Sequence, residues 1–431
     1  MENKITNKES GTLTALKAKK YRLFWTASIA SVGATQLLTL TAGKLVFDLS
    51  GSEFLLGLAA AVFGIGTIVI NFLGGVVADR IDKRILMIIT SFSMSISLLF
   101  LAIIDALNFE TVLLVVIFST IMGLISGFDW PVRSSIFPQF IDKKSQMMSA
   151  VALNAMLWQG LRILAPASGG FLIAYLGTHS VFFISASGFF VMGLVMIFIK
   201  PNKIENIQVE KKSVLKDTLE GINFIAKNKL FKVLILSTYI TSGLGMSYLQ
   251  LLPSFSSPYN NTIHGDLSAQ ILGLLASAGG IGALTGTAVT ARLRNKIKLG
   301  KLVLASNVLS VIFLFLFGLS NNFIFEENIY QNPWVSYNLI ISSILIIIVG
   351  LLNSIYMVGS MSILQLNVPE NLRGRVMGIH TITFSLMSAG ALFLGFMAQL
   401  LSSSIAVMIS AGFLILINFI IYSRNPDIRD I

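Results

Sequence analysis

The 431-residue sequence contains no cysteine and is poor in charged residues, proline and histidine. The lack of cysteine excludes disulfide bonds, thiolate zinc sites, iron–sulfur clusters and cysteine nucleophiles, and it leaves the redox compartment open. Only nine prolines and no low-complexity tract argue against a disordered chain. Charged residues make up 12% of the sequence, about half their usual share in soluble domains, which excludes a water-soluble fold with a polar surface.

Apolar residues dominate instead, at 55% of the chain, and the mean hydropathy is +0.81. A helix that crosses the bilayer needs about 20 apolar residues. Twelve stretches reach that length, at 23–43, 54–77, 85–105, 112–136, 147–176, 181–199, 233–252, 269–291, 302–319, 335–359, 376–400 and 403–421. The first is too long for a signal-peptide core, so we expect it to be retained. The sequence therefore predicts an all-α membrane protein with twelve transmembrane helices.

The basic residues follow the predicted topology closely. With twelve spans, 29 of the 31 lysines and arginines fall on the side of the two termini, while Lys44 lies on the other side and Arg162 within a span. Cytoplasmic loops carry the excess of basic residues in membrane proteins. We therefore expect a multi-pass protein of the cytoplasmic (inner) membrane with both termini in the cytoplasm. The net charge of +11 then needs no nucleic-acid partner.

The longest predicted cytoplasmic connection divides the spans into two sets of six. We expect a cytoplasmic N-terminal segment at 1–22, a six-helix bundle at 23–199, a linker with an amphipathic helix at 200–232, a second bundle at 233–422 and a cytoplasmic tail at 423–431. The two sets also echo each other, because a basic turn follows both the second and the eighth span. Two pseudo-symmetric bundles with a cavity between them at mid-membrane are a recurring plan of secondary transporters.

The turn after the second span carries the first motif, and segment 75–84 reads GVVADRIDKR. It resembles the signature loop G-x-x-x-D-R-x-G-R-R of the major facilitator superfamily, and it departs from that pattern at Asp82, which replaces the second glycine. The resemblance implies the twelve-helix fold of that superfamily. It also implies that Asp79 meets the positive N-terminus of a helix in the other half, and that Arg80 and Arg84 pair with an acid on the fourth span.

Asp129 is the acid on the fourth span that can take this part. At about 1.5 Å per residue it lies about 25 Å from the outer end of its helix, close to the inner surface. We expect it to pair with Arg80 or Arg84, with Arg133 one helical turn away as the competitor.

The resemblance implies that this network, together with Asp79 facing Arg373 and Gly374 at the start of the eleventh span, latches the halves in the outward-facing state. We favour this role for Asp129. A proton-carrying role and a plain surface ion pair stay open.

The fifth span contains Ala-Pro-Ala-Ser-Gly-Gly at 165–170, which resembles the G-P-x-x-G-G antiporter motif of drug exporters in the same superfamily. Pro166, Gly169 and Gly170 occupy the motif positions, and alanine replaces the first glycine. Proline bends the helix, and paired glycines let a neighbouring helix approach closely. In that family the motif accompanies export rather than uptake.

Arg162 precedes that proline by one helical turn and lies about 20 Å from the inner end of its helix. A charge at this depth needs either a solvated cavity or a partner. Asp48 and Asp105, near the outer ends of the first and third spans, are the acids best placed to pair with it. Arg162 either orients a polar or anionic group of a substrate or ties the structure together, and the sequence supports both roles equally.

Further landmarks resemble the macrolide-efflux and siderophore-exporter branch of the superfamily. They are Pro131, Arg133 and Pro138, then Ala-Leu-Asn at 152–154, and segment 369–378. We place Gln36 and Asn154 with Arg162 on the substrate path. Gln36 stands in a part of the first span where related exporters often carry an acid, which argues against simple proton coupling through that span.

Nothing in the sequence predicts enzymatic chemistry or a cofactor. The P-loop pattern G-x-x-x-x-G-K-[ST] is missing, and the three histidines are scattered without metal-ligand spacing. We expect no metal site and no catalytic residue.

The sequence thus predicts a monomeric secondary transporter, embedded in membrane lipids, that exports amphipathic small molecules resembling drugs or macrolides by alternating access with proton antiport. A lysophospholipid or siderophore exporter of the same fold is the alternative. A membrane receptor or scaffold without transport is the alternative from another class.

Overall fold

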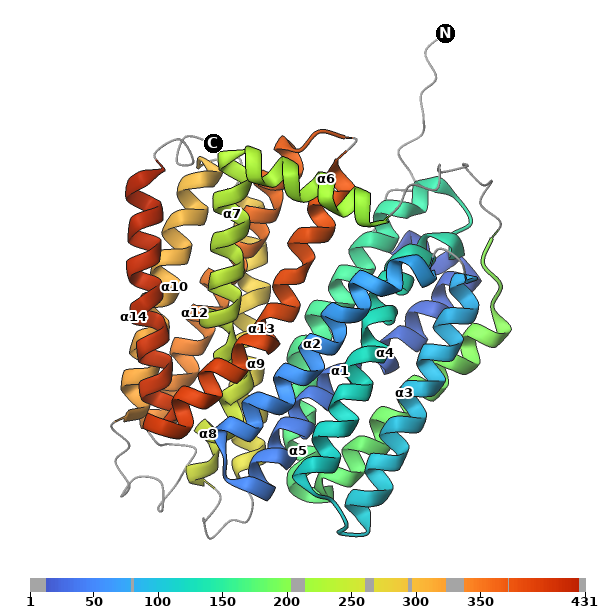
Figure 1. Cartoon of the computed structure of the whole chain (residues 1–431). Coiled ribbons are helices and arrows are strands. Elements are labelled where there is room, and N and C mark those ends of the chain that lie inside the picture. Colours follow the sequence, from blue (N-terminus) through green and yellow to red (C-terminus); the bar gives the residue numbers. More distant parts are fainter. Residues whose placement is uncertain are drawn as a thin grey trace.

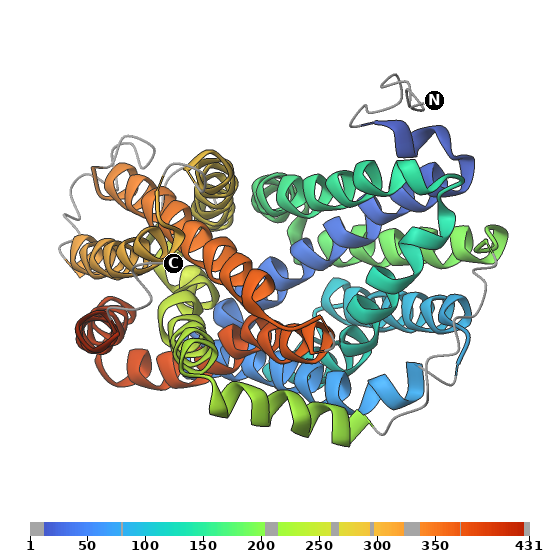
Figure 2. The same ribbon diagram turned by 90° about the horizontal axis from the view of Figure 1, so that it is seen from above.

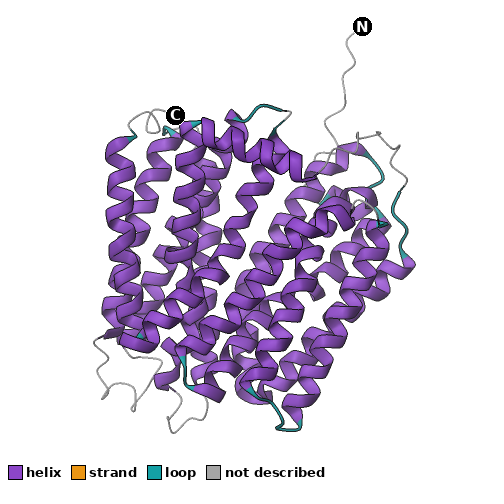
Figure 3. Cartoon of the chain, in the orientation of Figure 1, coloured by secondary structure: helices purple, strands orange, loops and turns teal. Residues whose placement is uncertain are grey.

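The computed structural model of the chain describes residues 13–78, 81–202, 214–259, 267–293, 297–322, 337–370 and 372–425. These residues form helices joined by turns, and no strand occurs among them (Figure 3). The long helices are α1 (Lys19–Ser50), α2 (Glu53–Ala78), α3 (Lys83–Ala106), α4 (Val112–Ile136), α5 (Met147–Phe198), α9 (Leu267–Leu293), α10 (Leu299–Asn322), α12 (Tyr337–Asn367), α13 (Arg373–Leu401) and α14 (Ser403–Arg424). The predicted all-α class is confirmed.

Two of the helical segments have irregular backbone. The helix α5 has 52 residues, which at about 1.5 Å per residue would make it about 78 Å long, far more than one crossing needs. Gly177, with φ of 78° and ψ of 167°, breaks it into two crossings. The other irregular crossing, Lys229–Tyr259, consists of α7 (Lys229–Ile240), a π-helical turn (Thr241–Met246), a 3₁₀ turn (Ser247–Leu251), α8 (Leu252–Ser256) and a last 3₁₀ turn (Ser257–Tyr259).

The crossings agree with the predicted number. Among the described residues, eleven helical segments are long and apolar enough to cross a membrane. Because α5 counts once among them and Gly177 divides it, the structure holds the twelve predicted crossings.

Local sequence signals start and stop these helices. The side chain of Asp82 accepts hydrogen bonds from the backbone N–H of Arg84 at 2.7 Å and of Ile85 at 3.3 Å, so it caps the N-terminus of α3. Capping explains why aspartate is tolerated where the superfamily loop has a glycine. Gly51, with φ of 59°, ends α1 in the left-handed conformation that glycine adopts at low cost.

The long helices form two groups that lie side by side (Figures 1 and 2). In the first group α1 and α3 pack on α5, and α2 packs on α4; in the second α12 packs on α9 and α10, and α10 packs on α14. The start of α1 and the end of α14 lie at the same end of the molecule as α6 (Val214–Lys227), which packs against α13 and α7. We call this end the terminal face. Odd crossings of the first group, such as α1, run from it to the opposite face.

Most of the buried apolar side chains lie within one group or the other, but one core cluster joins the two. It includes Leu37, Leu40 and Ile173 from the first group and Leu272 and Leu394 from the second. These residues lie away from the terminal face on their helices, so the groups are held together mainly in the half of the molecule nearer the opposite face.

Candidate functional site

The first contact between the two groups is a close approach of α2 and α13. A Cβ atom added at Gly57 would collide with the carbonyl oxygen of Ala391 and lie 3.1 Å from the Cα of Gly395. A Cβ at Gly64 would lie 2.5 Å from the Cβ of Ser388. The helices therefore touch backbone to backbone, which only small residues permit.

The second contact joins α5 to α9 and contains the predicted antiporter motif. A Cβ at Gly170 would collide with the carbonyl oxygen of Ala269, and one at Gly273 would lie 2.5 Å from the carbonyl oxygen of Pro166. Ser277 adds a hydrogen bond of 2.8 Å to the carbonyl oxygen of Ile163. Pro166 and Gly170 thus form part of the seal between the groups.

Gly169 of the same motif faces another helix. A Cβ there would meet Leu37 at 2.7 Å and Leu40 at 3.0 Å, both on α1. Gly169 therefore allows close packing inside the first group, next to the seal.

Polar contacts close the same interface at the opposite face. The hydroxyl of Ser52 donates a 2.6 Å hydrogen bond to the side-chain oxygen of Gln399. The hydroxyl of Ser254 lies 3.2 Å from the carboxylate of Glu53 and 2.8 Å from the hydroxyl of Ser403. Residues at the start of α2 are therefore tied to α13, α8 and α14.

Toward the terminal face the groups separate, as the exposure along α5 shows. On the face of α5 that turns away from the exposed Leu164 and Phe171, exposure falls steadily from the terminal face inward. Met148, Val151 and Ala155 are exposed, Arg162 is half-buried, and Pro166, Gly169 and Ile173 are buried. Because the buried end of this face packs on α9 and α1, its exposed end lines an opening between the groups.

The helix α13 shows the same gradient. Its residues facing α2, Ser385 and Ser388, are buried. About two and three helical turns nearer the terminal face, Gly378 and Gly374 are exposed, and a Cβ at either would meet no described atom within 4 Å. The molecule is therefore sealed at the opposite face and open at the terminal face.

A cavity of about 290 Å³ lies between α1, α2 and α4 of the first group and the irregular crossing and α13 of the second. No charged residue occurs among the described residues that line it. Its polar lining comprises Gln36, Thr39, Thr67, Ser119, Ser126, Gln250, Ser385 and Ser388, and its apolar lining includes Leu38, Leu56, Phe63, Met122 and Met387. Such a lining suits a ligand with an apolar body and a few hydrogen-bonding groups.

The irregular backbone of the Lys229–Tyr259 crossing brings Gln250 to this cavity. Its π-helical turn and the following 3₁₀ turn lie against α13. Ser242 of the first donates a 2.6 Å hydrogen bond to the carbonyl oxygen of Thr383, and Ser247 of the second donates one of 2.6 Å to that of Met387. Side-chain hydroxyls thus bond backbone carbonyls across the helix contact. Broken helices beside a mid-membrane cavity are typical of transporter binding sites.

Arg162 lies deep in the first group but not in the lining of this cavity. Tyr248 of the second group lies near its side chain, and its backbone packs against Gly280 of α9. The expected pairing with Asp48 or Asp105 is wrong. Asp48 forms an ion pair of 2.5 Å with Lys44, and Asp105 accepts a 2.5 Å hydrogen bond from Thr178. Both acids lie near the opposite ends of their helices, too far along the bundle from Arg162.

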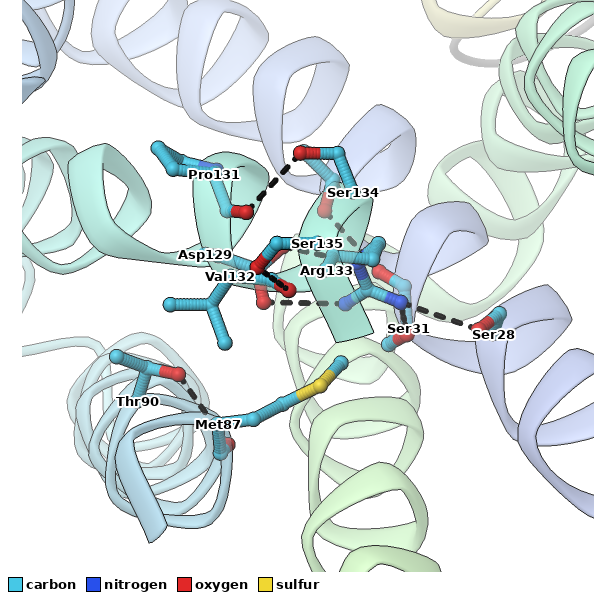
Figure 4. Close-up of polar contacts among 11 residues, drawn as sticks. Ser28, Ser31, Met87, Thr90, Asp129, Pro131, Val132, Arg133, Ser134 and Ser135 are labelled. Carbon is cyan, nitrogen blue, oxygen red and sulfur yellow. Dashed lines mark hydrogen bonds and ion pairs between the residues drawn. The ribbon is translucent and has the colours of Figure 1, made fainter. Parts of the chain in front are cut away.

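Asp129 pairs with Arg133, the competitor considered from the sequence. Their side chains are joined by two hydrogen bonds of 3.1 Å, and Arg133 also donates to the hydroxyls of Ser28 at 3.2 Å and Ser31 at 3.1 Å on α1 (Figure 4). The arginine side chain is 4% exposed and the aspartate side chain 17%. The pair therefore ties α4 to α1 inside the first group.

Arg84 takes a different partner from the one expected. It donates hydrogen bonds of 2.9 Å and 2.5 Å to the carbonyl oxygens of Met196 and Ile197, at the end of α5. The free carbonyls at a helix C-terminus attract cations, so this contact satisfies both groups. The predicted Asp129–Arg84 pair is thus wrong, and Arg80 lies outside the described residues.

The sequence matches the model of the Major Facilitator Superfamily over residues 24–392. The chain belongs to this superfamily of transporters. Among curated relatives, an uncharacterized MFS-type transporter of Bacillus subtilis, YfiS, is 24% identical over 68% of this chain and 67% of its own length. The staphyloferrin A transporter of Staphylococcus aureus is 23% identical over 82% and 83% of the two chains. The enterobactin exporter EntS of Citrobacter koseri is 21% identical over 95% and 92%.

Solved transporters share the fold. The nucleoside transporter NupG superposes with a TM-score of 0.72 at 13% identity, covering 94% of this chain and 98% of its own. A bacterial homologue of the lysosomal transporter Spinster, solved in an inward-facing conformation, superposes with a TM-score of 0.68 at 12% identity over 96% of each chain. At such low identity these likenesses establish the fold alone.

The remaining residues predicted for the latch and the substrate path of this superfamily member lie in different parts of the molecule. Asp79 lies outside the described residues. Arg373 and Gly374 are exposed at the start of α13, where nearby Arg375 forms a 2.7 Å ion pair with Glu220 of α6. Asn154 is half-buried on α5 and Gln36 lines the cavity. Of the three residues assigned to the substrate path, only Gln36 borders the cavity described above.

The sequence interpretation missed Gln250, Ser385 and Ser388. Serine and glutamine within an apolar span give no signal of their own. The run TSGLGMSYLQ at 241–250, with glycine and polar residues interrupting a hydrophobic segment, is the pattern that could have indicated a broken helix beside the site. No cluster of three potential metal ligands occurs among the described residues.

Proposed function

We propose that this chain exports amphipathic small molecules from the cytoplasm by alternating access. The observation that carries the proposal is the cavity of about 290 Å³ between the two groups, lined by uncharged polar and apolar side chains. The close helix contacts seal one face, and the opening at the other allows a ligand to enter between the groups.

The charge pattern orients this arrangement in the membrane. In the predicted topology 29 of the 31 basic residues lie on the side of the two termini, and α1 begins and α14 ends at the terminal face, so by the positive-inside rule we take this face as the cytoplasmic one. The state described here is then inward-facing and loads from the cytoplasm. Loading from the cytoplasm, together with the antiporter-type motif at the α5–α9 contact, favours export across the cytoplasmic membrane.

Proton antiport drives the export in this proposal, and the protein acts as a monomer. Asp129 has a structural role in this proposal rather than a place on the proton path, because its partner Arg133 ties it to α1 inside the first group. We assign the latch on the cytoplasmic face to Asp79, Arg80, Arg373 and Gly374, and in this proposal it forms when the opening there closes.

Two relatives favour a second candidate within the same class. The chain resembles a staphyloferrin A transporter and an enterobactin exporter over most of its length, at identities of 23% and 21%. A siderophore or lysophospholipid exporter would use the same cavity and the same alternating-access cycle.

The test is transport into everted vesicles with an imposed proton gradient. Uptake of ethidium and of erythromycin is compared between vesicles with the wild-type chain and vesicles without it, and uptake should require both the chain and the gradient. Gln250→Leu should weaken uptake several-fold, because it removes the amide from the cavity lining. Ser187→Leu, at an exposed position of α5, is the matched control and should transport normally. Equal uptake with and without the chain across a panel of amphipathic compounds would refute the proposal.

A further inference from the structure

Arg162 lies where the opening from the terminal face ends. The interior face of α5 is exposed at Ala155, half-buried at Arg162 and buried at Pro166, where the seal with α9 begins. A ligand that enters between the groups and moves along α5 therefore meets a guanidinium group just before the seal.

The two buried basic side chains of the described spans have acidic partners. Arg133 is paired with Asp129, and Lys44 with Asp48. Arg162, in contrast, forms no ion pair and donates no side-chain hydrogen bond among the described residues. Its neighbour Tyr248 is a phenol, which carries no charge to balance the guanidinium. The described interior thus keeps one uncompensated positive charge at the closed end of the opening.

Such a charge is costly to keep inside a membrane, and intramembrane arginines therefore usually face a partner or a ligand. A guanidinium offers two parallel N–H donors that match the two oxygens of a carboxylate. The cavity lined by Gln36 and Gln250 carries no charged residue among its described lining, so it accepts the uncharged part of a ligand without selecting for charge.

We propose that Arg162 binds a carboxylate of the substrate in the inward-facing state, so that the exporter selects anionic amphiphiles over neutral ones. This inference rests on the proposed function, because it places the substrate in the opening between the groups. It assigns the acid-binding part of the substrate site to α5 and the recognition of the uncharged part to the cavity.

The experiment compares a carboxylate with its neutral amide. Dansyl-undecanoate and the corresponding primary amide are titrated against the full chain in phosphatidylcholine nanodiscs, and binding is followed by dansyl fluorescence. Hydrogen bonds to a charged group change affinity by about tenfold or more, so wild-type protein should bind the carboxylate at least about tenfold more tightly than the amide. Arg162→Gln should remove this preference without changing the affinity for the amide. Arg162→Lys keeps the positive charge but loses the two parallel N–H donors, so it should keep part of the preference for the carboxylate.

Lys301→Gln is the matched control. It also removes one positive charge, but from an exposed position at the start of α10, and it should leave the preference unchanged. A second measurement needs no change at Arg162. With Ala155→Cys as reporter in the otherwise cysteine-free chain, the carboxylate should slow maleimide labelling at concentrations where the amide does not.

The outcomes separate this inference from the proposed function. If the wild-type chain binds the amide as tightly as the carboxylate, or if Arg162→Gln keeps the preference, the inference is overturned, even when vesicle uptake of neutral compounds still shows export. If the carboxylate preference depends on Arg162 but no compound is transported, the anion site stands and the proposed function fails.

Discussion

The substitution Gly170→Val should shift the transporter away from the state described here, which is sealed at the opposite face. Gly170 of α5 packs against α9, where a Cβ would collide with the carbonyl oxygen of Ala269 and lie 3.0 Å from the Cα of Gly273. Both neighbours are backbone atoms, so no side chain can rotate away. Valine fits only if the two helices move apart. It therefore raises the free energy of the state in which α5 and α9 are in contact, and it leaves the state in which they are apart unaffected.

The magnitude follows from the cost of overpacking. Forcing additional carbon atoms into a close-packed contact costs about 1 to 3 kcal/mol. Because the penalty falls on one of two alternating states, it shifts their ratio by a factor of about 5 to 150 toward the state that is open at the opposite face.

Two cysteine reporters measure the shift, because the chain has no cysteine of its own. Leu40→Cys lies in the core between the groups and should react faster with an impermeant maleimide added from outside when Gly170→Val is present. Ala155→Cys lines the opening on the terminal face and should react more slowly from the cytoplasmic side of everted vesicles.

Gly160→Val provides the matched control on the same helix. A Cβ at Gly160 meets nothing within 4 Å, so valine there should leave both labelling rates unchanged. Unchanged rates in a properly inserted Gly170→Val protein would refute the reasoning. A rise at both reporters together would also count against it, since it indicates unfolding rather than a shift between two states.

Three further outcomes are expected. Phe109→Cys, exposed at the opposite face, should react with an impermeant thiol reagent in intact cells, and Lys200→Cys only after permeabilisation; the reverse pattern would invert the topology. Asp129→Asn should lower the free energy of unfolding of the purified protein by about 1 to 3 kcal/mol through loss of a largely buried ion pair, and adding Arg133→Gln should restore part of it; strictly additive effects in this double-mutant cycle would show that the pair is not coupled. Asp79→Asn should nearly abolish vesicle uptake at normal membrane insertion, because the latch biases two states that are close in energy, and full uptake would contradict the latch.

Features that depend on position along the chain could be predicted from the sequence. Hydrophobic length fixes the crossings, because a helix in lipid must satisfy its own backbone, and the break at Gly177 lies in the predicted gap between two spans. The motif at 165–170 also indicated a close helix contact, and Pro166 and Gly170 do form one with α9. Local spacing suffices for such features, since each depends on a few consecutive residues.

The partners of charged side chains required the tertiary structure. Depth estimates placed Asp129 near the basic turn, yet its partner is Arg133 one turn away, while Arg84 binds the carbonyls at the end of α5. Depth along a helix gives no information about the direction in which a side chain points around it. That direction decides which partner lies within hydrogen-bonding distance. It also makes Gln250 and Ser388 part of one cavity, although their positions in the sequence differ by 138.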